Sequence, residues 1–313
     1  MGDVIHNLPM VTDVAEHILG AQIDWVVEEA FADIPALHPK VNRVVPVALR
    51  CWRKKIFNTS VWREIKATKR RLREHNYDVV LDSQGLLKSA PLARFAQGKI
   101  FGPDRLSARE PLAVKLYHRT FSIAKDRHAV LRNRELAARV FDYPIPRTPP
   151  DCGINLGGST APAEFPQKYI VCLHATSRDS KLWPESRWMA LASRLASTGI
   201  TPVFPWGSER ERQRAQTIAH QIKEAVILPK TSLKRLVKII HHARAVVGVD
   251  TGLAHLAAAI GCPTVAVYID TDPMLTGVLS ANPARAVNLG NKGAPPSVPE
   301  VMAALTRMQV CPA

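Results

Sequence analysis

Short runs of β-branched residues alternate along this chain with stretches in which apolar residues recur at helical spacing. The runs predict strands near Ile23–Val27, Arg43–Val47, Asp78–Asp82, Lys99–Phe101, Tyr169–Ala175, Thr201–Pro205, Ala225–Leu228, Ala245–Val249 and Thr264–Tyr268. The stretches predict helices near Ser186–Ser197, Glu209–Ile222, Ser232–His241 and Pro299–Met308. Because strands that alternate with helices form βαβ units, we predict an α/β fold with parallel sheets.

A proline-rich stretch divides this pattern into two halves. Tyr143–Pro150 contains four prolines, and Gly- and Pro-containing sequence continues to about Pro166. Proline lacks a backbone N–H and fixes φ, so we expect a linker here rather than a helix or a strand. The length of 313 residues also favours two domains, which we place at 1–150 and 151–313.

The N-terminal half opens in an unusual way. Doubly wound domains normally begin with a buried strand, but Val4–Leu19 has a helical pattern preceded only by Met-Gly-Asp. One interpretation is that the first strand of the N-terminal sheet is missing from this sequence. The alternative is a domain that begins with a helix.

The charge distribution points to an anionic partner. The formal net charge is +15, and Arg50–Arg73 contains ten basic residues against one acid, Glu64. Such a cluster attracts nucleic acid, a phosphorylated substrate or an anionic membrane surface. The alternative is the solvated face of a helix.

Several classes of protein are excluded by features that the sequence lacks. No apolar run approaches the ~20 residues needed to span a bilayer. The five cysteines are scattered, which indicates reduced thiols in a cytosolic protein rather than a disulfide framework or a zinc site. The chain has no GxGxxG after a strand, no GxxxxGK[ST] and no HExxH, so a nicotinamide or flavin enzyme, a P-loop NTPase and a zinc site are not expected.

The most informative local motif follows the predicted strand Ala245–Val249. Asp250 ends the strand, Thr251 and Gly252 form a turn, and a helix of small residues places His255 on its first turn. A helix N-terminus carries partial positive charge and unpaired N–H donors, so it suits a phosphate. The alternative is an ordinary capped crossover helix.

A second loop is expected at the same edge of the sheet. It follows the strand at Tyr169–Ala175 and carries Thr176, Ser177 and Lys181, which are residue types that contact phosphates. Ligands of open α/β sheets bind outside the carboxyl ends of the strands, so this loop and the Asp250 turn support each other as one site. A solvated loop is the alternative.

Four further residues or segments have two interpretations each. Trp206 follows another strand and is either a platform for a base or ribose, or a core residue. Glu211 either accepts hydrogen bonds from a ribose or caps a helix. Asp270–Asp272 has a DxD pattern that can hold a divalent ion, although a turn before Pro273 explains it equally well. Asp3, at a predicted helix start, has the N-cap as its commoner role.

Five separated segments together resemble the lipopolysaccharide heptosyltransferases of glycosyltransferase family 9. They are Met1–Pro9, Asp24–Glu29, Asp82–Leu86, Ala108–Leu112 and Asp250–Leu256. The second segment and Arg50–Lys54 are most similar to type I enzymes, with types II and III as the alternative. The resemblance implies a GT-B fold, in which two Rossmann-like domains face each other across a cleft.

The resemblance also implies an activity and a set of site residues. The reaction would be the inverting transfer of L-glycero-D-manno-heptose from ADP-heptose to Kdo of Kdo2-lipid A, without a metal or another cofactor. The implied catalytic base is Asp3. The implied donor-binding residues are Thr176, Ser177, Lys181, Glu211, Asp250, Thr251, Gly252 and His255. The implied acceptor-binding residues are Arg50, Arg53, Lys54 and Arg109.

Such an enzyme is expected in the cytoplasm, in peripheral contact with the anionic inner membrane, with no nucleic acid as a partner. Two alternatives remain at this point. A basic nucleic-acid-binding protein would account for the charge but not for the motifs of the second half. A truncated, inactive relative that still binds the donor would account for the missing first strand.

Overall fold

The structure, a computed structural model, describes residues 1–55, 57–160 and 165–311 and divides into two compact units. One unit is His6–Thr148, here called the N-terminal unit, and the other joins Met1–Ile5 to Pro149–Ala313, here called the C-terminal unit. The first five residues are grouped with the second half of the chain, and the domain boundaries at 1–150 and 151–313 stay a prediction. Residues 161–164 of the predicted linker lie outside the described residues.

The C-terminal unit contains a six-stranded sheet whose strands are all parallel, in the order β11-β10-β9-β6-β7-β8. The strands are β6 (Tyr169–Leu173), β7 (Thr201–Phe204), β8 (Val226–Ile227), β9 (Ala245–Val249), β10 (Thr264–Tyr268) and β11 (Ala286–Gly290). Every residue of the three central strands β6, β9 and β10 is buried. Five of the six strands were predicted, and β11 was missed.

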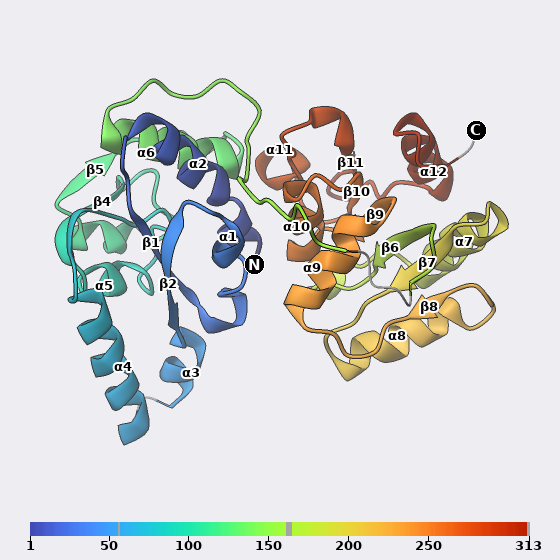
Figure 1. The fold of residues 1–313 in the computed structure, drawn as a ribbon, viewed down its shortest axis with the longest axis horizontal. Helices are drawn as coiled ribbons and strands as arrows, with labels where there is room; N and C mark the ends of the chain where they lie inside the picture. The colour runs from blue at the N-terminus through green and yellow to red at the C-terminus, as the bar shows by residue number, and fades with distance from the viewer. Residues whose placement is uncertain (56, 161–164, 312–313) are drawn as a thin grey trace. The chain divides into compact units, whose positions relative to one another are not determined.

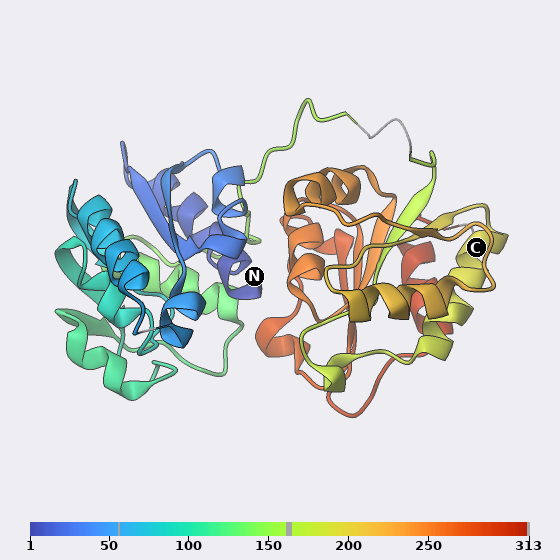
Figure 2. The ribbon, with the colours of Figure 1, turned by 90° about the horizontal axis from the view of Figure 1, so that it is seen from below.

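Helices cover both faces of this sheet (Figures 1 and 2). One core joins the sheet to α7 (Glu185–Ser197), α8 (Glu209–Ala219) and α12 (Val298–Arg307). A second core joins the other face to α9 (Leu233–His242) and α10 (Gly252–Ala259). The short helices of the unit are α1 (Gly2–Ile5), α11 (Pro273–Thr276) and the 3-10 turns Asp179–Lys181 and Pro283–Arg285. This layering leaves the carboxyl-end edge of the sheet to the loops.

Among its described residues, the N-terminal unit has five parallel strands, which form two separate sheets rather than one. The first sheet pairs β1 (Ile23–Glu28) with β2 (Val41–Val47), and the second has the order β3 (Asn76–Leu81), β4 (Gln97–Pro103), β5 (Arg119–Phe121). The short strand β5 was not predicted. That a further strand belongs to this unit stays a prediction.

Helices of the N-terminal unit alternate with these strands. They are α2 (Leu8–His17), α3 (Leu49–Lys54), α4 (Thr59–Leu72), α5 (Ala90–Ala93), α6 (Ala129–Phe141) and the 3-10 turns Glu29–Phe31, Pro35–Leu37 and Pro111–Leu116. The prediction of a single helix at Val4–Leu19 is wrong, because this segment forms two helices, α1 and α2, separated by a turn. Pro9 lies in the first turn of α2, where its missing N–H costs no helical hydrogen bond.

A buried ion pair fixes α2 against α6. The Arg134 guanidinium donates to both carboxylate oxygens of Asp13, at 2.7 and 2.8 Å, and both side chains are almost completely buried. Arg134 also donates to the carbonyl oxygen of Thr148 at 2.7 Å. The last residue of the N-terminal unit is thereby held against its helices.

Within the described residues, no helix is long and apolar enough to cross a membrane.

Candidate active site

Loops from three strands of the C-terminal unit meet around one carboxylate. Asp250 directly follows β9 and is 8% exposed. Its Oδ2 atom accepts hydrogen bonds from Lys181 Nζ at 2.6 Å and from Thr271 Oγ1 at 2.7 Å. The Nε2 atom of His255, on α10, lies 3.6 Å from Oδ1. The loops after β6 and β10 and the first turn of α10 are thus joined to Asp250.

The surroundings of Asp250 keep it ionised. Burial alone would raise the pKa of this carboxyl, but interactions with His255, Lys181 and Thr271 outweigh burial and lower its pKa well below the ordinary value. The carboxylate therefore holds the Lys181 ammonium in a defined position at the sheet edge. A fixed cation at that edge is suited to an anionic ligand.

The N-terminus of α10 supplies further donors at the same place. Thr251 is its N-cap residue, and in the described part of the chain its side chain makes no capping hydrogen bond. The Oγ1 atom of Thr176 donates to the carbonyl oxygen of Asp250 at 3.0 Å, which ties the loop after β6 to this turn. The predicted convergence of these two loops at one edge is confirmed.

The side chain of Met1 closely approaches Gly252. A Cβ atom at this position would lie 2.5–2.8 Å from the Cβ, Cγ and Sδ atoms of Met1. A Cβ on Gly2 would lie 3.8 Å from Cδ2 of His255. Helix α1 therefore packs on α10, and Asp3 lies in the first turn of α1. Sequence reasoning did not foresee that Asp3 and the predicted donor-binding residues share one unit.

The remaining residues of the loop after β6 have separate roles. Ser177 is exposed. Ser180 donates to Asp270 Oδ2 at 2.6 Å, and Asp272 Oδ1 caps α11 by accepting from the amide of Met274 at 2.8 Å. The acidic residues of the DxD pattern thus each have a structural partner.

Among the residues described here, no group of three His, Cys, Asp or Glu side chains has the arrangement of a metal site.

Glu211 and Trp206 lie at the carboxyl end of β7. The Oε2 atom of Glu211 accepts from the amides of Gly207 at 2.6 Å and Ser208 at 3.3 Å, which completes a capping box at the start of α8. The Trp206 indole N–H donates to the carbonyl oxygen of Leu228 at 2.5 Å, and the side chain is half-buried. Capping is therefore one role of Glu211, and contact with a ribose stays a prediction.

Two substitutions of Glu211 separate these roles. Glu211→Ala is expected to lower the free energy of unfolding by about 0.5–2 kcal/mol, because the capping box is lost. Glu211→Gln is expected to retain the cap and its Tm but to bind ADP several-fold more weakly, since a ribose hydroxyl then loses a charged acceptor. Thermal unfolding and calorimetric titration with ADP measure both, and Ser208→Ala is the matched cap-only control. An ADP affinity of Glu211→Gln equal to wild type would contradict the ribose contact.

The predicted acceptor residues lie in the N-terminal unit. Arg50, Arg53 and Lys54 lie on α3, and the Arg50 guanidinium lies 5.6 Å from the centroid of the Phe31 ring. Arg109 is exposed in the segment between β4 and β5. The three residues of α3 thus share one short helix, while Arg109 comes from another part of the unit.

Sequence reasoning missed Arg132, which lies on α6. Burial and repulsion from Arg109 lower the pKa of its guanidinium. Its Nε atom is buried and has no hydrogen-bond partner in the described part of the chain. Two neighbouring cations, one of them partly desolvated, favour an anionic group between them. No local motif marks Arg132, because it sits inside a helical pattern.

A network of hydrogen bonds positions the segment that carries Arg109. Asp82 accepts from Tyr117 Oη at 2.7 Å, from Ser89 Oγ at 2.8 Å and from the amide of Gln84 at 2.9 Å. The turn that follows Asp82 contains Gly85, whose carbonyl oxygen accepts from the amide of Glu110 at 2.9 Å. Asp82 is buried and structural, and through this turn it fixes the residue next to Arg109.

Comparison with known proteins identifies the class. The model of glycosyltransferase family 9 (heptosyltransferase) matches residues 65–301. Lipopolysaccharide heptosyltransferase 1 of Pseudomonas aeruginosa is 48% identical over 279 residues, which cover 88% of this chain and 78% of that protein. The protein of the same name from Escherichia coli K12 is 46% identical over 283 residues, covering 90% of this chain and 89% of that one.

Solved structures agree with the sequence comparison. The E. coli heptosyltransferase WaaC with ADP has a TM-score of 0.90 at 42% identity, and the match covers 98% of this chain and 97% of that chain. WaaC with ADP-2-deoxy-2-fluoro heptose has a TM-score of 0.86 at 42% identity, with coverage of 98% and 96%. This chain belongs to glycosyltransferase family 9, the heptosyltransferases. It is a glycosyltransferase, and the predicted GT-B class of α/β fold is confirmed.

Proposed function

We propose that this protein transfers heptose from ADP-heptose to Kdo of Kdo2-lipid A in the synthesis of the lipopolysaccharide inner core. The observation that carries the proposal is the arrangement of Lys181, Asp250 and the start of α10 in a chain similar to type 1 heptosyltransferases. WaaC, 42% identical to this chain, was solved with ADP and with a fluorinated ADP-heptose. The donor is therefore assigned to the carboxyl-end edge of the C-terminal sheet.

Asp3 is proposed as the general base. A hydroxyl of Kdo loses its proton to the Asp3 carboxylate as its oxygen forms a bond to the anomeric carbon of heptose. The bond from that carbon to the β-phosphate oxygen breaks, and ADP leaves with the electron pair. Because attack and departure occur on opposite faces, a single displacement inverts the anomeric configuration. The packing of α1 on α10 supports this role, since it brings the helix of Asp3 to the donor residues.

Stabilisation of the leaving group is assigned to fixed positive charge. The Lys181 ammonium, held by Asp250, and the N-terminal amides of α10 would face the negative charge that grows on ADP. Thr176, Ser177, Thr251, Gly252 and His255 complete the proposed donor site, and Glu211 is assigned to the ribose. Because Lys181 and the α10 amides would stabilise the charge that grows on ADP, the proposed reaction requires no metal.

The acceptor is assigned to basic residues of the N-terminal unit. Arg50, Arg53 and Lys54 would meet the phosphates and carboxylates of Kdo2-lipid A, together with Arg109. The missed residue Arg132 joins Arg109 in this proposal, because its guanidinium has a buried atom without a hydrogen-bond partner in the described chain. Since this acceptor is a lipid, we further propose that the protein works in the cytoplasm, in peripheral contact with the inner membrane. No nucleic-acid partner is proposed.

The test is a transfer assay with ADP-heptose and Kdo2-lipid A. We expect heptosylated Kdo2-lipid A by mass spectrometry, with ADP released in equal amount and the anomeric configuration inverted by NMR. The rate is expected to persist after exhaustive chelation with EDTA. Release of ADP without a glycosylated lipid would contradict the proposed acceptor, and transfer only to an already heptosylated lipid would favour a type II enzyme. Loss of activity on chelation, restored by a divalent ion, would overturn the metal-free mechanism.

A further inference from the structure

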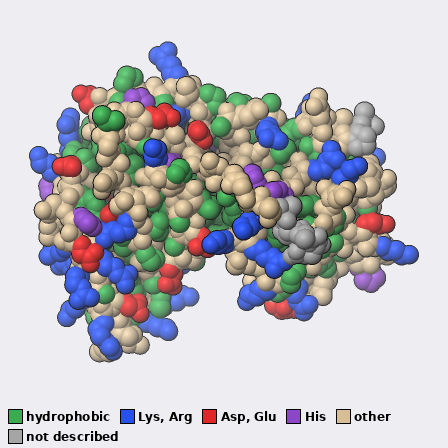
Figure 3. Space-filling model, viewed as in Figure 1, with side chains coloured by type: hydrophobic (Ala, Val, Ile, Leu, Met, Phe, Trp, Pro, Cys, Tyr) green, Lys and Arg blue, Asp and Glu red, His purple; other side chains and the backbone are tan. Residues whose placement is uncertain are grey.

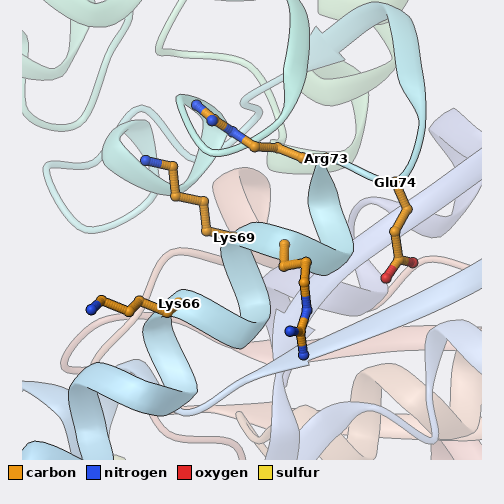
Figure 4. A pocket seen from close by; sticks show the side chains of 5 residues that line it. Lys66, Lys69, Arg73 and Glu74 are labelled. Carbon is orange, nitrogen blue, oxygen red and sulfur yellow. The ribbon is translucent and has the colours of Figure 1, made fainter.

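A row of basic side chains follows one face of α4, outside the proposed site. Lys66, Lys69 and Arg73 occur at i, i+3 and i+7, so they lie on one face of the helix. With Arg70 and Glu74 they line a hollow in the surface (Figure 4). We call Lys66, Lys69, Arg70 and Arg73 the α4 basic stripe. Basic side chains gather over the region of α3 and α4 at the lower left of Figure 3.

The nearby acids are turned to other partners. Glu64, the one acid in Arg50–Arg73, accepts a hydrogen bond from the Trp52 indole N–H at 2.9 Å. Glu74 accepts from Arg43 Nη1 at 3.0 Å. In Figure 4 the side chains of Lys66, Lys69 and Arg73 extend to one side of the helix, and that of Glu74 extends to the other. All four side chains of the stripe are exposed. Arg73 Nε donates to the carbonyl oxygen of Phe95 at 3.3 Å, and Lys69 Nζ lies 6.0 Å from the centroid of the Phe95 ring, so among the described residues no acid neutralises these two cations there.

Two aromatic side chains lie at the N-terminal end of the stripe. Phe57, just before the N-cap of α4, is 99% exposed, and Trp62 is 50% exposed. Trp62 precedes Lys66 by four residues, so it continues the face of the stripe. A fully exposed phenyl ring has no polar group that would favour water, so it gains from an apolar environment.

The other face of α4 is fixed to the N-terminal unit. Val61 and Leu72 are each 2% exposed, and Ile65 packs on the cluster of Val47, Trp52 and Val61. This contact sets the rotation of the helix and turns Trp62 and the stripe outward. An amphipathic helix with lysine and arginine on its polar side and aromatic residues near one end has the composition of an interfacial membrane helix.

We propose that Phe57, Trp62 and the α4 basic stripe form the surface by which this protein docks on an anionic lipid bilayer. The rings would enter the boundary between headgroups and acyl chains, and the four cations would contact lipid phosphates. The proposal rests on the membrane contact inferred above and assigns that contact to residues outside the proposed catalytic and acceptor sites. A bilayer is favoured over a nucleic acid because Phe57 offers only an apolar surface and is fully exposed.

Sedimentation with vesicles of phosphatidylcholine alone, or mixed with phosphatidylglycerol, tests the proposal without any substrate. Wild type is expected to bind the anionic vesicles more tightly, and added salt should weaken this binding. Each basic residue near such a surface contributes about fivefold in affinity, so the triple variant Lys66→Ala, Lys69→Ala, Arg70→Ala should bind about 100-fold more weakly. Phe57→Ser with Trp62→Ser should lose about tenfold, because apolar area no longer enters the bilayer.

The matched control removes the same charge elsewhere. Lys223→Ala, Lys230→Ala, Lys234→Ala changes three exposed lysines of the C-terminal unit and should bind vesicles within about twofold of wild type. An equal loss in both triple variants would show a response to net charge alone and overturn the proposal. It would also be overturned if the aromatic variant bound like wild type. Unchanged vesicle binding with loss of tight RNA binding in the stripe variant would assign this face to nucleic acid instead.

These experiments can reject the proposed heptose transfer and the proposed docking surface independently of each other. With the acceptor dispersed in detergent, the stripe variant is expected to keep the wild-type rate of heptose transfer, whereas on acceptor embedded in anionic vesicles its rate should fall with its binding. Wild type that binds vesicles but transfers no heptose would reject the proposed reaction and leave the docking surface standing. Far-UV circular dichroism and Tm values equal to wild type confirm that the variants are folded.

Discussion

Replacement of Asp3 by asparagine is expected to lower kcat for heptose transfer by about 10²–10⁴-fold, the usual contribution of a general base. Asparagine keeps the size and a carbonyl oxygen of the side chain but does not take a proton from the attacking hydroxyl. Affinity for ADP should change by less than about threefold, because the proposed donor contacts come from Lys181 and α10. Steady-state kinetics together with calorimetric titration of ADP separate the two effects.

Asp3 also has a structural role, which has to be distinguished from its proposed role as the base. The residue lies in the first turn of the four-residue helix α1, where a carboxylate also favours a helix N-terminus electrostatically. Loss of that structural role costs about 0.3–2 kcal/mol of stability and does not slow the reaction by orders of magnitude. Glu16→Gln, an equal change of charge on an exposed residue of α2, is the matched control. If Asp3→Asn kept more than a third of the wild-type kcat, the base would have to lie elsewhere.

The parts of the fold that were predictable are those in which local pattern and burial agree. Strands β6, β9 and β10 are buried throughout, and their continuous β-branched runs gave their positions almost to the residue. The missed strand β11 is only half-buried and carries Asn288, whose side chain bonds the backbone of Val278. A polar residue in mid-strand removes the apolar run on which prediction relies. Strand β5 is too short to show a period.

The same distinction applies to the residues of the candidate site. Asp250 and Lys181 were predicted at one edge because parallel strands place their carboxyl ends together, and that proximity follows from topology alone. Contacts between distant segments have no such rule. The hydrogen bond of Thr271 to Asp250, the approach of Met1 to Gly252 and the proximity at which Arg109 repels Arg132 depend on loop conformations and packing. The DxD pattern was ambiguous for this reason, since only the fold gives its residues their partners.

The second large effect is expected from Lys181. We expect Lys181→Ala to lower kcat/KM for ADP-heptose by about 10²–10³-fold, comparable with the loss of a preorganised donor that stabilises transition-state charge. The Kd of ADP should rise by about 10–100-fold, because a charge-assisted hydrogen bond to the pyrophosphate is lost. The two effects differ because negative charge on the leaving group grows as the bond to the anomeric carbon breaks, so Lys181 contributes more to the transition state than to the bound donor.

A substitution of Asp250 tests whether the position of the Lys181 ammonium matters, in addition to its charge. Asp250 holds Lys181 Nζ at 2.6 Å. Although burial raises the pKa of the Asp250 carboxyl, interactions with His255, Lys181 and Thr271 lower it further, so the carboxylate stays ionised at neutral pH. Asp250→Asn retains Lys181 but removes its anchor, so it is expected to weaken ADP binding less than Lys181→Ala and to lower kcat through misplacement of the cation. Lys230→Ala, an exposed lysine of the same unit, should leave both constants unchanged. An unchanged Kd and kcat in a folded Lys181→Ala protein would move the pyrophosphate away from this edge and reject the proposed donor site.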